Sequence, residues 1–478
     1  MDKTAETDPA LASRQLVTKQ AVGRHLAVEL SETAKLALPM ALTQLGQIAI
    51  MTIDLAIIGR AGFKAVAAAA LAGRVYFVGV AFGIGLLGAI AAFAAQAFGA
   101  DNLGMARRSL RMGLWASLVL SVPIVAFGLC GEQILLALGQ DPEAVRLAQQ
   151  YLLGLAWGAA PALWFQVIRS FMGAVTRPEP VLWITLAAVP ANALLVYLLM
   201  YGKLGLPRLD LFGAGLATTL VNCATFLAGL WFATMRRPFR DYHLFARLWR
   251  FDWPLMRQLI AIGIPISIAS LIESGLYSGA SLLAGLISTS ALAAHQIAYQ
   301  VLAMPFMISF GISMTAAVRI GHAVGRNDGP GIKRAGLVAM LLGVLIAAML
   351  ALAVIVTRFE IAKLFLGEST SDASATIGLA ATLLSVGASF FIIDAMQIIA
   401  AGGLRGLKDT RVPLLFAGIA YWLIGLPVSY MLSLKIGLGA IGIWIGLASG
   451  ASVYAGLLVL RFRLLANRFA LHSQTFIA

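Results

Sequence analysis

The chain has 478 residues, of which 60% are apolar and only 12% are charged. A soluble domain of this length needs a larger polar surface to cover its core, so the composition indicates a membrane protein. The net charge of +14 does not indicate a nucleic-acid partner, because the basic residues are spread among short connections and form no patch with interleaved aromatics.

Long apolar segments follow one another along the whole chain. A segment of about 20 apolar residues can cross a bilayer as an α-helix, and runs this continuous lack the alternation of β-barrel strands. The expected spans are 36–58, 75–98, 110–130, 148–171, 181–201, 211–234, 257–287, 292–320, 335–357, 376–403, 412–434 and 438–462. The sequence therefore predicts an all-α integral membrane protein with twelve transmembrane helices.

The distribution of basic residues predicts the orientation. The tails and the connections after even-numbered spans, with the adjoining helix ends, hold 26 of the 35 Lys and Arg residues. Cytoplasmic connections are enriched in Lys and Arg, so both termini are expected in the cytoplasm. The first 30 residues contain no apolar stretch typical of a signal peptide, and the first span is expected to direct insertion.

The two halves of the chain resemble each other. Pairing each residue with the one 226 positions later aligns Pro39 with Pro265 and Gly99 with Gly325, and the stretch GAVTR from Gly173 resembles GLKDTR from Gly406. Six spans per copy give both copies the same orientation, so we expect two lobes with a cavity between them. The predicted parts are a tail (1–35), an N-terminal lobe (36–235), a basic linker (236–256), a C-terminal lobe (257–462) and a tail (463–478).

Three acidic residues interrupt the apolar spans. Asp54 lies late in the first span, Glu273 lies midway through the seventh and Asp394 lies in the tenth. A carboxylate in hydrocarbon costs a few kcal/mol, so such residues are functional candidates, although each could instead fix helix packing as a protonated or hydrogen-bonded carboxyl. Two carboxylates with nearby neutral oxygens suit Na⁺, whereas a carboxyl in an apolar cavity can instead carry H⁺.

Uncharged polar residues in the spans are weaker candidates for a substrate path. Met304 and Phe306 could form an adaptable surface for flat organic cations, or could simply pack against lipid and helices. The amides could line a path or form hydrogen bonds between helices; they are Gln44, Gln47, Gln166, Asn192, Asn222 and Gln397.

Motifs for other chemistry are absent from the sequence or misplaced in it. No GxxxxGK[ST] is present, so ATP is not the evident energy source, and no HExxH is present. Cys130 and Cys223 fall inside predicted spans, where we expect buried free thiols and neither a disulfide nor a metal set. No cofactor beyond a coupling ion is expected.

Three stretches carry a resemblance to a known family. They are IDLAIIGR (53–60), the segment 293–325 and DAMQIIAAGGLRGLKDTR (394–411). The chain resembles the multidrug and toxic compound extrusion (MATE) family, NorM-type branch, over residues 30–465. The resemblance implies a non-enzymatic antiporter of the bacterial inner membrane, expected as a monomer, that exports small organic cations in exchange for Na⁺ or H⁺.

The resemblance also implies roles for the three acids. Glu273 and Asp394 match the cation-coupling acids, which would hold the metal ion if the ion is Na⁺, and Asp54 matches the acid of the N-terminal lobe. Ala188 departs from the Asn expected one turn before Asn192. Two alternatives remain open: an intramembrane enzyme that uses the same acids as general acid and base, and a flippase for lipid-linked sugars.

Overall fold

The computed structural model describes residues 9–244, 247–366 and 371–475, and these residues are almost entirely helical. Eleven helices in this part of the chain are long and apolar enough to cross a membrane. A twelfth span results if α6 (Pro142–Ala156) and α7 (Ala159–Ala174), which meet at an angle of 48°, are counted as one. The predicted fold class is confirmed.

The first half of the chain forms one group of helices, here called the N-lobe. Apart from α6 and α7 these are α1 (Pro9–Gly59), α2 (Phe63–Leu87), α3 (Ala89–Gly99), α4 (Leu103–Leu129), α5 (Gly131–Ala137), α8 (Glu179–Tyr201) and α9 (Asp210–Met235). Helices α2 and α3 join end to end into a single span, from Phe63 to Gly99.

The second half forms the C-lobe, after a short 3₁₀ turn η1 (Phe239–Tyr242). Its long helices are α10 (Trp253–Ile287), α11 (Thr289–Gly325), α12 (Gly329–Leu366), α13 (Ser371–Gly406) and α16 (Gly439–Thr475). One further span alternates between ordinary and wide π-helical turns: α14 (Arg411–Ala417), η2 (Gly418–Gly425), α15 (Leu426–Tyr430) and η3 (Met431–Lys435).

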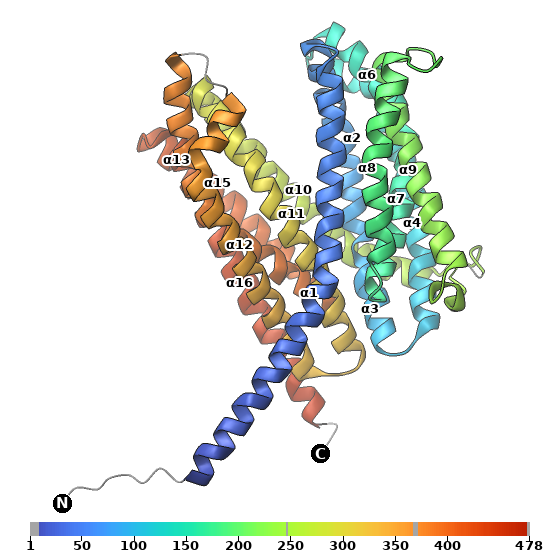
Figure 1. Ribbon diagram of the computed structural model, residues 1–478, viewed down its shortest axis with the longest axis vertical. Helices are drawn as coiled ribbons and strands as arrows, with labels where there is room; N and C mark the ends of the chain where they lie inside the picture. Colours follow the sequence, from blue (N-terminus) through green and yellow to red (C-terminus); the bar gives the residue numbers. More distant parts are fainter. Residues whose placement is uncertain (1–8, 245–246, 367–370, 476–478) are drawn as a thin grey trace, which may run out of the picture.

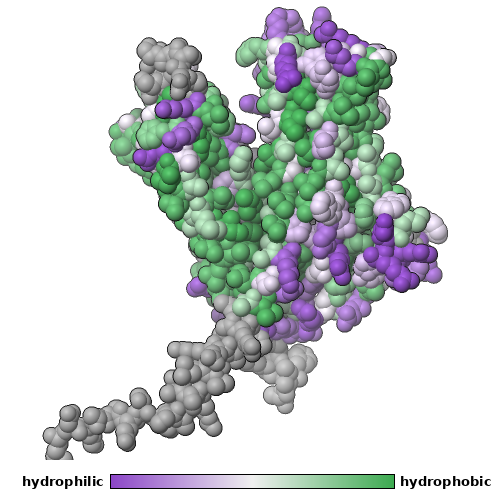
Figure 2. All heavy atoms as spheres, in the orientation of Figure 1, coloured by the Kyte–Doolittle hydropathy of each residue, from purple (hydrophilic) through white to green (hydrophobic). Residues whose placement is uncertain are grey.

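The two lobes form a V (Figure 1). They meet where α1 and α3 pack against α11 and where α2 packs against α10. The closed end is the one at which α1 begins and α16 ends, here called the termini side, and a deep notch separates the lobes on the opposite, open side (Figure 2). A cavity between two lobes is the arrangement that the internal repeat predicts.

On the face shown in Figure 2, the middle part of both lobes is mostly hydrophobic, and hydrophilic residues gather towards the ends. Large apolar side chains such as Trp183, Leu352 and Leu423 are exposed. A soluble protein rarely exposes apolar surface on this scale, whereas a bilayer would cover it.

The segment before α10, expected to be a linker, is packed against the N-lobe. Trp115 Nε1 on α4 donates a hydrogen bond to Leu248 O at 2.9 Å, and Arg111 Nη1 donates one to Arg247 O at 3.1 Å. Arg108 forms an ion pair with Asp252 at 3.6 Å. The connection between the lobes is therefore held against α4 on the termini side.

Most of the predicted N-terminal tail is helical, because α1 begins at Pro9; residues 1–8 lie outside the described part. One expectation needs correction. The prediction of two buried cysteines was wrong, since Cys130 is exposed and Cys223 is partly exposed. Cys130 follows directly after α4, so it sits at a helix end and not within a span.

Candidate functional site

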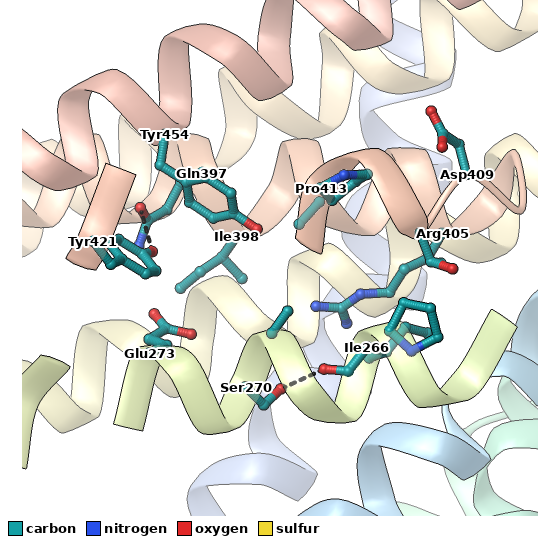
Figure 3. A pocket seen from close by; sticks show the side chains of 14 residues that line it. Ile266, Ser270, Glu273, Gln397, Ile398, Arg405, Asp409, Pro413, Tyr421 and Tyr454 are labelled. Atoms are coloured by element: carbon teal, nitrogen blue, oxygen red, sulfur yellow. Dashed lines mark hydrogen bonds between the residues drawn. The ribbon is translucent and has the colours of Figure 1, made fainter. Parts of the chain in front are cut away.

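A cavity of about 50 Å³ lies inside the C-lobe, here called the C-lobe pocket (Figure 3). Glu273 on α10, Arg405 at the end of α13, and Tyr421 and Tyr454 on the last two spans line it. Gln397 of α13 also faces it. A single water needs roughly 10–15 Å³, so the pocket has room for a few waters or a partly hydrated ion.

A chain of hydrogen bonds connects Asp394 to this pocket. Gln397 Nε2 donates to Asp394 Oδ1 at 2.8 Å, and the Tyr421 hydroxyl donates to Gln397 Oε1 at 2.9 Å. Asp394 and Gln397 are each only 1% exposed, and their spacing of three residues puts them on one face of α13. The two acids predicted to act together thus reach one pocket, Glu273 directly and Asp394 through Gln397.

One carboxylate oxygen of Glu273 lacks a hydrogen-bond partner in the part of the chain that the structure describes. Its Oε1 is buried and makes no hydrogen bond among the described residues. The guanidinium of Arg405 points into the same pocket (Figure 3) and lies 5.9 Å from the ring centre of Phe310, but the described residues contain no ion pair between Arg405 and Glu273. Leaving such a group unsatisfied costs about 1–3 kcal/mol or more, which favours an added cation or proton at Glu273, while the positive charge of Arg405 in the same pocket acts against it.

Wide helical turns help to build the pocket. Tyr421 belongs to the π-helical stretch η2, and π turns change which side chains a helix turns towards its neighbours and are frequent at functional sites. Sequence reasoning missed Arg405, Tyr421 and Tyr454 because the polar residues that it considered did not include Arg or Tyr. The available signal was that each places a polar group within a mostly apolar span.

The third acid, Asp54, lies in the interior of the N-lobe. It is 8% exposed, and Asn192 Nδ2 on α8 donates a hydrogen bond to its Oδ1. Thr218 Oγ1 on α9 is 3.3 Å from both Asp54 Oδ2 and Ala214 O, and its single proton can serve only one of them. Asp54 and the C-lobe acids therefore belong to separate polar clusters, one in each lobe.

The remaining amide candidates do not gather into one site. Gln44 Nε2 lies 3.7 Å from Met314 Sδ, so it links α1 to α11 across the two lobes. Asn222 Nδ2 donates to Gly158 O at 3.5 Å within the N-lobe. Gln166 is buried in α7, and Gln47 is partly buried in α1.

The two apolar candidates lie on α11. Met304 is 61% exposed. Phe306 is stacked nearly parallel to Phe310, with ring centres 6.3 Å apart, and Phe310 is the ring that Arg405 approaches. Phe306 therefore lies near the C-lobe pocket, although it does not line it.

Comparison with known families settles which kind of protein this is. A family model described as MatE matches the chain twice, at residues 39–198 and 265–431. The chain belongs to the MATE family of transporters. The two matches begin at Pro39 and Pro265, the prolines that the internal repeat pairs.

Relatives place this MATE transporter in the NorM branch. It is 59% identical to the probable multidrug resistance protein NorM of Bradyrhizobium diazoefficiens, over 93% of this chain and 95% of that one. It is 54% identical to the protein of the same name from Rhodopseudomonas palustris, over 92% of each. A crystal structure of MATE in complex with MaL6 shares the fold, with a TM-score of 0.85 and 20% identity over 92% of this chain and 97% of that chain.

Proposed function

We propose that this MATE transporter exports small organic cations across the bacterial inner membrane by exchanging them for Na⁺ or H⁺ that binds in the C-lobe pocket. The observation that carries the proposal is the buried Oε1 of Glu273, which has no hydrogen-bond partner among the described residues, beside the chain formed by Asp394, Gln397 and Tyr421. The names of the NorM relatives, probable multidrug resistance proteins, support drugs as the exported class.

The volume of the C-lobe pocket indicates that the ion and the drug bind at different places. Drug-sized ligands occupy pockets of roughly 300–1,000 Å³, and the C-lobe pocket, at about 50 Å³, is several times too small. Two places are large enough for a drug: a pocket of about 490 Å³ on the termini side, beside Arg319 and His322, and the notch between the lobes, open on the side opposite the termini (Figure 2). The notch is the place proposed for the drug. Binding of the ion then affects binding of the drug through the movement of the lobes.

The chemistry of the pocket suits a hard cation or a proton. Among the described residues no three His, Cys, Asp or Glu side chains converge, so two carboxylates would be completed by neutral oxygens such as those of Gln397 and the tyrosines. Oxygen ligands of this kind suit hard cations. A proton shared between the acids is the other way to neutralise them.

Helix α10 connects the pocket to the N-lobe. Glu273 and Ser270 face the pocket, while Ser267 on the same helix donates a hydrogen bond to Phe82 O on α2 at 2.6 Å. Pro265 also lines the pocket and lies inside α10, where it removes one hydrogen bond of the helix and permits bending. Binding of an ion at Glu273 can therefore shift α10 relative to the N-lobe.

Asp54 is proposed to act on the substrate side of the exchange. With both termini in the cytoplasm, α1 runs outward and Asp54 lies near its outer end. The notch would then face the periplasm. Protonation of Asp54 would remove the charge that attracts an organic cation and so promote its release.

Proteoliposomes loaded with ethidium, a flat organic cation, test the proposal. We expect efflux when a Na⁺ gradient is imposed at equal pH, or when a pH gradient is imposed without Na⁺, and no requirement for ATP. Glu273→Gln and Asp394→Asn should each abolish the driven efflux. Normal driven efflux by the double variant would refute the coupling role, and translocation of lipid-linked sugar without dye transport would favour a flippase.

A further inference from the structure

Several polar contacts join the lobes on the termini side, among them an ion pair between Arg319 of α11 and Glu29 of α1, and two of them are hydrogen bonds to main-chain carbonyls. Gln96 on α3 of the N-lobe donates Nε2 to Gly406 O of the C-lobe at 2.8 Å. His322 on α11 of the C-lobe pairs its Nε2 with Ala174 O of the N-lobe at 2.6 Å. A carbonyl oxygen can only accept, so Nε2 carries the proton in this contact. Each lobe thus donates to a main-chain carbonyl of the other.

The donors occupy equivalent positions of the internal repeat. His322 lies 226 positions after Gln96, the spacing that also relates Gly99 to Gly325. A Cβ added to Gly99 would clash with the main chain of His322, and one added to Gly325 would clash with the main chain of Gln96. The ends of α3 and α11 therefore touch backbone to backbone, which holds both donors in place.

The acceptors are equivalent as well. Ala174 is the last residue of α7 and Gly406 is the last residue of α13. Two positions further on, Thr176 and Lys408 both have a left-handed backbone with φ 59°. Their N–H groups bond back to the carbonyls of Gly173 and Arg405, at 3.0 and 2.9 Å.

This turn explains why the two carbonyls are available. The last carbonyls of a helix have no partner within it, and a left-handed turn satisfies those just before the final residue. The carbonyl of the final residue is left over, and in each lobe it accepts the donor from the other lobe. The two bonds are therefore one contact made twice by the repeat.

We infer that Gln96 and His322 are the two arms of a latch that keeps the termini side closed while the opposite side is open. Donor and acceptor of each arm belong to different lobes, so both bonds must break before the termini side can open. The latch rests on the proposed function only in requiring two alternating conformations. The opening of the termini side can be measured without any transport assay.

Distances between spin labels test the latch. Labels on Arg177→Cys in the N-lobe and Lys333→Cys in the C-lobe, both exposed on the termini side, report opening in a Cys130→Ser, Cys223→Ser background. Double electron–electron resonance on reconstituted protein measures the distances between the two labels. The distance distribution then gives the ratio of molecules that are open to those that are closed on the termini side. Gln96→Ala or His322→Ala should each raise that ratio roughly fivefold, the effect of losing one net hydrogen bond. The double variant should raise it about 25-fold if the arms add.

Two further variants distinguish the latch from a general loss of packing. Ser109→Ala removes a side-chain bond to Met105 O of 3.0 Å that stays within the N-lobe, and it should leave the ratio unchanged. His322→Gln puts at position 322 the same residue type that donates from the N-lobe at Gln96. This variant should show the wild-type ratio, and it can be measured even if His322→Ala fails to fold.

The latch is refuted if Gln96→Ala and the double variant leave the distances unchanged, or if Ser109→Ala shifts them equally. Ethidium efflux measured on the same samples separates the two proposals. Suppose that the variants open on the termini side but the wild type shows no gradient-driven efflux. That result would support the latch and refute the antiport.

Discussion

Replacing Glu273 by Gln should strongly weaken ion binding while keeping the shape of the C-lobe pocket. The substitution removes one negative charge from a carboxylate whose Oε1 has no hydrogen-bond partner among the described residues. A unit charge 4 Å away at an effective dielectric constant of about 20 contributes about 4 kcal/mol. At about 1.4 kcal/mol per tenfold change, this corresponds to roughly three powers of ten in affinity.

Calorimetry of the purified protein in lipid nanodiscs measures this effect. Na⁺ binding should weaken at least about 100-fold in Glu273→Gln, allowing for the lower desolvation cost of the amide. If the coupling ion is H⁺, the quantity to compare is the number of protons released when ethidium binds. The wild type should release protons, and Glu273→Gln should not. Thermal unfolding of each sample shows that the variant is folded.

Ser270→Ala is the matched control. Ser270 lines the same pocket, but its hydroxyl donates to Ile266 O of its own helix at 3.1 Å and carries no charge. Its loss should change ion affinity by no more than about threefold, the scale of half a hydrogen bond. If folded Glu273→Gln binds the ion within threefold of the wild type, the pocket is not the coupling site.

Four further predictions follow from the same geometry. Asp54→Asn should weaken ethidium efflux more than ion binding, because Asp54 lies in the other lobe from the C-lobe pocket; loss of ion binding with intact ethidium binding would contradict this. A reporter fused after Phe469 should be active in the cytoplasm, as the charge distribution predicts, and activity only in the periplasm would reverse the topology. Tyr421→Phe should lower the free energy of unfolding by about 1–3 kcal/mol, since it leaves a buried amide oxygen without its donor; Tyr454→Phe, in the same pocket, should cost less in thermal unfolding. Burial lowers the pKa of Lys408 from 10.5 to about 8, so the folded protein binds this proton less tightly than the unfolded chain; stability should rise between pH 8 and 10.5 in the wild type, and Lys408→Met should remove that contribution to the rise.

Hydropathy was sufficient to predict the order and approximate positions of the spans because the bilayer sets a minimum apolar length for each of them. It could not predict how the spans are built. No apolar count distinguishes the π-helical turns of η2 from an ordinary helix, or predicts the bend between α6 and α7. Both depend on packing against neighbouring helices, and η2 contributes Tyr421 to the pocket.

The acids of the candidate site were predictable because a carboxylate in hydrocarbon is costly and therefore conspicuous. Their partners were less so. Asn192 was singled out on α8 but not paired with Asp54, since only the fold brings α1 and α8 together. The repeat was also aligned one residue off at its later motif: similarity of letters paired Gly173 with Gly406, whereas the helix ends pair Ala174 with Gly406.

The latch differs from most contacts between protein domains in that its acceptors are main-chain atoms. Substitutions in the two loops that keep the left-handed turns at Thr176 and Lys408 leave those carbonyls in position, and the loops already differ in sequence after the helix ends. An insertion or deletion within α7 or α13 would displace them. The contact can therefore persist while the loops accumulate point mutations, and substitutions in the notch need not disturb the closure of the opposite side.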